Sequence, residues 1–152
     1  MNAPPSPEAN VKCAVPFFCV TDMERSLRYY VDGLGFARTN QWVVNGEMRW
    51  CWLKLGGAAL MLQSCGKKML DSMPEGAKLG QGVSIWFQCE DAIAIYRDVQ
   101  SRGIEASEPQ VGNGLWDTAL SDPDGYRLHF ESPTDVPEET KLSEVQPVQQ
   151  GI

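Results

Sequence analysis

Apolar and polar residues follow one order twice along this chain. Residues 11–20 (VKCAVPFFCV) predict a strand because they are rich in β-branched and aromatic residues. A helix follows, capped by Thr21 or Asp22, because apolar residues then recur at helical spacing. Further strands are predicted over residues 36–44, 48–55 and 58–63, with the Asn45-Gly46 pair indicating a hairpin. The first half therefore has the order strand, helix, strand, strand, strand.

The same order returns after a polar connector. A strand is predicted over residues 82–89, a helix from Glu90 or Asp91, and strands over 104–111, 115–121 and 126–132. Matching positions in the two halves lie 68 or 69 residues apart, as Asp22 and Asp91 do, and Met61 and His129. A repeat of this length indicates two copies of one unit, each with an apolar face that must be covered.

The predicted fold class is α+β, with two βαβββ modules forming a curved, cup-shaped mixed sheet and helices on its outer face. The modules can pair within one chain or by exchange between two chains. The predicted organisation is a disordered tail (1–10), a first module (11–64), a connector (65–81), a second module (82–133) and an acidic C-terminal extension (134–152).

Charge and composition exclude several kinds of partner. The formal net charge is −7, whereas nucleic acids and anionic membranes require a basic surface. No apolar run approaches the ~20 residues that span a bilayer, and the N-terminus lacks the pattern of a signal peptide. The five cysteines form no CxxC pair and lie mostly in strand-like runs, which is typical of reduced thiols in a cytoplasmic protein.

The chain's only histidine lies in a segment that starts with a tight turn, Asp122-Pro123-Asp124-Gly125. The residues after this turn alternate, so His129 and Glu131 share one face of a predicted strand. This face is expected to line a pocket. General acid–base chemistry by His129 with Glu131 stays open, because side chains two residues apart on a strand are neighbours.

Two segments, AVPFFCVTDMERSLRYYVDGLGF and DPDGYRLHFESP, give residues 11–133 a resemblance to a known family. The chain resembles the vicinal oxygen chelate superfamily, which includes glyoxalase I, bleomycin resistance proteins and extradiol dioxygenases. The resemblance implies a divalent metal held by one side chain from the first and one from the last strand of each module. These positions fall on Val15, Met61, Ser84 and His129, and only His129 is a good ligand. A rearranged set of His129, Glu131 and Gln63 is the alternative.

Aromatic residues are expected to replace the metal in the cup. The chain has five tryptophans, and alternation places several of them on the face that holds the metal in the family. The alternative is that they only fill the core. The predicted ligand-binding residues are Phe17, Trp50, Trp52, Met61, Gln63, Ser84, Trp86, Gln88, Trp116 and His129.

Three functions follow from these observations. The first is a metal-independent binding protein of the bleomycin resistance type, a homodimer without a cofactor that sequesters an aromatic or amphipathic small molecule. The second is a divalent-metal-dependent lyase, isomerase or dioxygenase with the rearranged ligand set. The third is a structural module without a ligand. The family alone cannot choose among them, because one fold hosts many functions.

Overall fold

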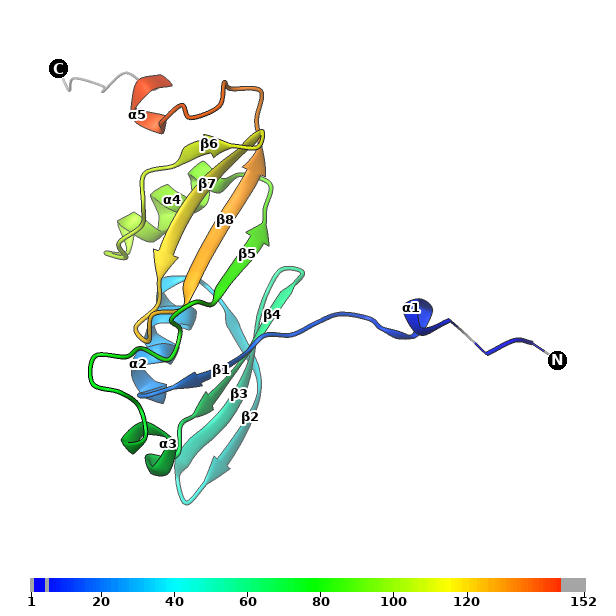
Figure 1. Cartoon of the computed structure of the whole chain (residues 1–152), viewed down its shortest axis with the longest axis vertical. Helices are drawn as coiled ribbons and strands as arrows, with labels where there is room; N and C mark the ends of the chain where they lie inside the picture. The colour runs from blue at the N-terminus through cyan, green and yellow to red at the C-terminus, as the bar shows by residue number, and fades with distance from the viewer. Residues whose placement is uncertain (1, 5, 146–152) are drawn as a thin grey trace.

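The computed structural model describes residues 2–4 and 6–145 and contains two four-stranded sheets (Figure 1). The first half comprises α1 (Pro7–Asn10), β1 (Phe17–Val20), α2 (Met23–Leu27), the π-helix η1 (Arg28–Gly33), β2 (Ala37–Val44), β3 (Glu47–Leu55), β4 (Ala58–Ser64) and α3 (Lys67–Asp71). The second half comprises β5 (Ser84–Gln88), α4 (Ala92–Ser101), β6 (Gln110–Gly112), β7 (Leu115–Ser121), β8 (Arg127–Pro133) and α5 (Leu142–Val145).

The two sheets repeat one topology. Their strand orders are β1-β4-β3-β2 and β5-β8-β7-β6, so equivalent strands occupy equivalent places. In each sheet the first and last strands of the module run parallel, and the other pairs are antiparallel. The predicted α+β class with two βαβββ modules is therefore confirmed. Figure 1 shows the two sheets one above the other, with α2 and α4 on the same side of the molecule.

The observed first strand is shorter than the strand predicted from the sequence. Only Phe17–Val20 form β1, although residues 11–20 have strand-like composition. Pro16 stands at the boundary, where its carbonyl accepts a hydrogen bond from the Met61 amide at 2.9 Å. A proline has no amide to continue the ladder, which explains the short strand. The segment before Pro16 runs away from both sheets in Figure 1.

The first helix begins as the sequence predicts. The Asp22 side chain caps it by accepting from the Arg25 amide at 3.1 Å. Thr21, the other candidate cap, instead donates from its amide and its hydroxyl to the Asp124 carboxylate, at 3.1 and 2.6 Å. The helix continues as η1, which buries Tyr30 completely, and Gly35 follows with a φ of 87°.

The Asp122–Gly125 turn joins the two modules. The Tyr30 hydroxyl from η1 donates to the buried Asp122 carboxylate at 2.7 Å. The Tyr126 hydroxyl donates to the Cys19 carbonyl at 2.9 Å, and the Tyr126 ring stacks on Phe18 at 3.9 Å. One hydrophobic cluster consequently contains residues of both modules. The two modules therefore contact each other in the single chain.

The C-terminal segment covers the far edge of the second sheet. Glu138 accepts hydrogen bonds from the Asn113 and Gly114 amides, at 2.9 and 2.7 Å. Leu142 is buried against Trp116 in a second, smaller core cluster. A frayed tail is predicted for the last eight residues, of which 146–152 lie outside the described part. Within the described residues, no helix combines the length and apolar character needed to cross a membrane.

Candidate functional site

The second sheet carries a stacked aromatic pair on the face opposite its helix. Trp86 on β5 and His129 on β8 are direct neighbours in the strand register. Their rings are 3.8 Å apart and nearly parallel, at 7°. The stack leaves Trp86 50% exposed, which is unusual for the largest apolar side chain. An exposed, oriented indole is a surface on which a planar molecule can stack.

Asp117 on β7 holds the histidine from the other side. Its two carboxylate oxygens lie 3.1 and 3.0 Å from His129 Nδ1. A carboxylate only accepts hydrogen bonds, so Nδ1 donates, and Nε2 is the ring nitrogen left for other contacts. The partner predicted for His129 was Glu131, and Asp117 was not predicted. The alternation of residues 115–121 was the available signal, since it places Asp117 on the face that His129 occupies.

Glu131 has a different partner. It accepts a short hydrogen bond from the Gln88 amide on β5. The Trp86 indole nitrogen donates to the Ser84 hydroxyl at 3.2 Å. The predicted residues Ser84, Trp86 and Gln88 therefore lie on one face with His129, as the alternation indicated.

The first sheet presents an equivalent face. Phe17 lies opposite Met61 in the register, at the place that Trp86 and His129 occupy in the second module. Phe17 is 52% exposed, close to the value for Trp86. Trp50 and Trp52 lie beside this pair on β3, with ring centroids 6.5 Å apart. The Trp52 indole nitrogen is buried, and no protein group in the described part accepts its hydrogen.

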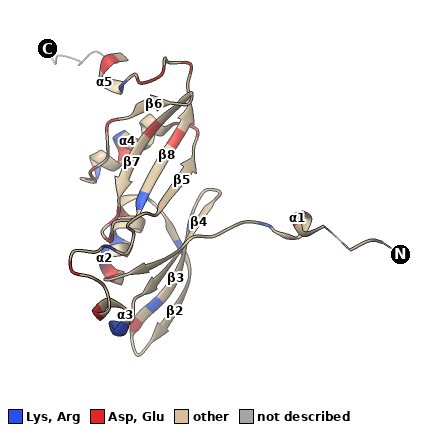
Figure 2. Ribbon diagram, in the orientation of Figure 1, with Lys and Arg blue, Asp and Glu red and all other residues tan. Residues whose placement is uncertain are grey.

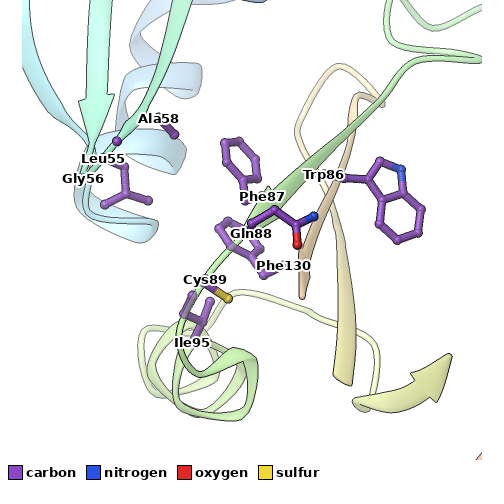
Figure 3. Close-up of a pocket in the computed structure, with 10 residues that line it drawn as sticks. Leu55, Gly56, Ala58, Trp86, Phe87, Gln88, Cys89, Ile95 and Phe130 are labelled. Atoms are coloured by element: carbon purple, nitrogen blue, oxygen red, sulfur yellow. The ribbon is translucent and has the colours of Figure 1, made fainter. Parts of the chain in front are cut away.

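An apolar cavity of about 570 Å³ opens between the modules (Figure 3). One wall is the β3–β4 hairpin, and the other is formed by β5, β8 and α4. In Figure 3, Phe87 and Phe130 point toward the hairpin, while Trp86 points to the other side of β5. The cavity thus reaches around the edge of β5 to the aromatic face. Its lining residues are Leu55, Gly56, Gly57, Ala58, Trp86, Phe87, Gln88, Cys89, Ile95 and Phe130.

Cys89 is the one cysteine in the lining of this cavity, and its surroundings disfavour the thiolate form. Its thiol donates to the Glu131 carbonyl at 3.3 Å. Burial raises the pKa of the Cys89 thiol above its ordinary value, and so disfavours the nucleophilic thiolate. Burial, and then the neighbouring Cys19, likewise raise the pKa of Cys65 to about 11. All five cysteines are free thiols.

The residues at the family's metal positions do not fit a hard divalent ion. Val15 has no donor atom, Met61 offers only a thioether, and Ser84 is a weak neutral ligand. In the alternative set, His129 and Glu131 lie on β8, whereas Gln63 lies in the other sheet between Cys19 and Trp50. Within residues 2–4 and 6–145, no three His, Cys, Asp or Glu side chains are grouped so that they could hold a metal ion.

One predicted ligand-binding residue lies elsewhere. Trp116 was expected to line the cup, but it is only 6% exposed and packs in the second core cluster with Ala92 and Val111. On β7, Asp117 and Ala119 face the cup side, and Trp116 and Thr118 face the helix. The assignment was off by one residue, and a shift of one residue moves a side chain to the other face of the sheet.

Comparisons with known proteins agree with this architecture. The model of the Glyoxalase/Bleomycin resistance protein/Dioxygenase superfamily matches residues 13–130. TnmS3, an antibiotic binding protein from Streptomyces sp. CB03234, is 22% identical with a TM-score of 0.61, over 79% of this chain and 93% of that chain. A bleomycin resistance determinant encoded on the transposon Tn5 is 21% identical with a TM-score of 0.63, over 83% and 100%. TioX from Micromonospora sp. ML1 is 19% identical with a TM-score of 0.63, over 81% and 99%. A search of curated protein sequences finds no match.

Proposed function

The chain belongs to the Glyoxalase/Bleomycin resistance protein/Dioxygenase superfamily, and from this premise we propose that it sequesters a planar aromatic or amphipathic small molecule without a metal ion. The half-exposed Trp86, stacked on His129 beside an apolar cavity, carries this proposal. Small-molecule sites combine an apolar wall with a few oriented polar groups. Gln88 and the Asp117–His129 pair supply such groups next to the indole.

The descriptions of two similar proteins support the proposal that this chain sequesters a small molecule. One is described as an antibiotic binding protein and another as a bleomycin resistance determinant. The donor set at the family's metal positions supports binding without a metal, because it offers one good ligand of four. The free cysteines favour a reducing compartment such as the cytoplasm.

A second copy of the chain is proposed to close the cup. Three large apolar side chains on the strands, Phe17, Trp42 and Trp86, are each at least half exposed in the single chain. Burying apolar surface is the dominant favourable term in association, so these side chains would stabilise a homodimer. Sedimentation equilibrium would then give about twice the chain mass, and a monomer at every concentration would contradict this part of the proposal.

Two measurements test the function. Elemental mass spectrometry on untagged protein purified without chelator should find no bound divalent metal, and one equivalent per chain would contradict metal-free binding. Calorimetric titration with a neutral planar probe, 2-naphthamide, should show saturable binding that Trp86→Ala weakens about tenfold through loss of the stacking surface. Trp116→Phe is the matched control, since Trp116 lies in the core. Unchanged affinity for 2-naphthamide in Trp86→Ala would contradict a binding site for the aromatic ligand at Trp86.

A further inference from the structure

A second cleft lies at the other end of the aromatic face, where the connector between the modules meets the start of β8. It has a volume of about 430 Å³. Two of its residues are cations, and all the others are glycines or carry polar side chains. The lining residues are Gly76, Lys78, Gln81, Gly82, Ser121, Gly125 and Arg127.

The connector is fixed on the Asp122–Gly125 turn by close backbone contacts. The Gly80 amide donates to the Asp124 carbonyl at 3.0 Å, and any side chain at Gly80 would collide with the Tyr126 amide. The aliphatic part of Lys78 packs over Gly125, with its Cβ and Cδ 3.0 Å from where a side chain on that glycine would begin. The fold therefore places Lys78 in the same cleft as Arg127, the first residue of β8.

Arg127, the first residue of β8, lies between two hydroxyl side chains. The strand register pairs it with Ser84 on one side and with Ser121 on the other. Arg127 and His129 are two residues apart on β8, so they lie on the same face of the sheet. Their positions along the strand are separated by about 7 Å. Arg127 thus stands between two serines on the neighbouring strands, one step along the same face from the paired residues Trp86 and His129.

Neither cation has a side-chain partner among the described residues. In the described part of the chain, no ion pair or side-chain hydrogen bond involves Lys78 or Arg127, although the chain has 20 acidic residues against 13 basic ones. Glu105 lines the neighbouring cavity with Arg127, but no ion pair within 4.0 Å joins them. Figure 2 shows the basic position at the start of β8, and acidic positions near the start of β7 and toward the end of β8.

We propose that the Lys78–Arg127 cleft is an oxyanion subsite, so that the planar ligand bound at Trp86 carries a carboxylate or phosphate group. Guanidinium, ammonium and hydroxyl groups all donate hydrogen bonds, and together they match the oxygens of such a group. This inference rests on the proposed function for the ring, whereas the oxyanion subsite itself can be tested alone.

Inorganic phosphate tests the subsite without any ring. In ¹H–¹⁵N spectra at constant ionic strength, phosphate should cause saturable shifts of the Gly82 and Gly125 amides. Arg127→Gln should weaken this binding about tenfold. Lys67→Gln, on exposed α3, removes the same charge outside the cleft and should leave the shifts unchanged. Absent shifts, or equal affinity in all three proteins, would overturn the subsite.

A matched pair of ligands tests the link to the ring. 2-Naphthoate should bind the wild-type protein about tenfold more tightly than neutral 2-naphthamide, and both Arg127→Gln and Lys78→Gln should abolish this difference. Equal binding of the two ligands would overturn the acidic ligand and leave the aromatic site standing. If neither ring binds while phosphate still does, the proposed function fails together with the acidic ring ligand.

Discussion

Asp122 links the two modules through a buried hydrogen bond, and its removal should be costly. The carboxylate is only 4% exposed. It accepts three hydrogen bonds, from the Tyr30 hydroxyl at 2.7 Å and from the Asp124 and Tyr126 amides at 2.9 Å each. Asp122→Ala would leave the fully buried Tyr30 hydroxyl without an acceptor, and an unsatisfied buried group costs about 1–3 kcal/mol.

The total follows from these three contacts. The lost Tyr30 bond and two unpaired amides lower the free energy of unfolding by about 3–5 kcal/mol in Asp122→Ala. For a chain of this size that corresponds to a melting temperature about 10 °C lower. Denaturant unfolding monitored by circular dichroism measures the change, with the exposed Asp71→Ala as control.

A double-mutant cycle separates the hydrogen bond from general damage. Tyr30→Phe removes only the donor, and should cost about 1–2 kcal/mol. Because the two side chains contact each other, the double variant should be less destabilised than the sum of the single variants by at least about 1 kcal/mol. Additive effects, or a cost below about 1 kcal/mol for Asp122→Ala, would refute the role given to this carboxylate.

The remaining predictions concern charge, close contacts and the two faces of the sheet. Burial raises the pKa of Tyr126 from 10.0 to about 12, so its contribution to stability is fully present below pH 10 and is lost as the pH rises toward 12. Unfolding free energy should therefore fall with pH above 10, and less steeply in Tyr126→Phe; equal slopes would contradict the assignment. Gly80→Ala should destabilise the protein by about 1–3 kcal/mol in denaturant unfolding, because its methyl group meets backbone atoms. Gly57→Ala should not destabilise the protein, because its methyl group would meet nothing within 4 Å. Similar losses of unfolding free energy in Gly80→Ala and Gly57→Ala would contradict the close contact at Gly80. Trp116→Ala should lower the free energy of unfolding by about 3–5 kcal/mol and leave the affinity for 2-naphthamide unchanged. Trp86→Ala should instead weaken 2-naphthamide binding and leave the free energy of unfolding nearly unchanged.

Local pattern determined most of the architecture. The Asn45-Gly46 turn, the Asp22 cap and the glycine after the first helix all follow from the conformations that these residues favour. The 68-residue offset predicted two βαβββ modules, and both sheets have the same strand order. Alternation along β5 and β8 placed Trp86, Gln88 and His129 on one face. Each of these signals involves residues close together in the chain, so the sequence alone displays it.

Tertiary structure decided what each site residue contacts. Sequence alternation gives two faces to a strand but does not fix the register, so it misplaced Trp116 and did not reveal that Asp117 holds His129. Sequence alternation also does not predict the Lys78–Arg127 cleft, because a connector of irregular backbone brings the lysine to β8. Such contacts join residues far apart in the chain, and their geometry depends on the packing of whole elements rather than on local preference.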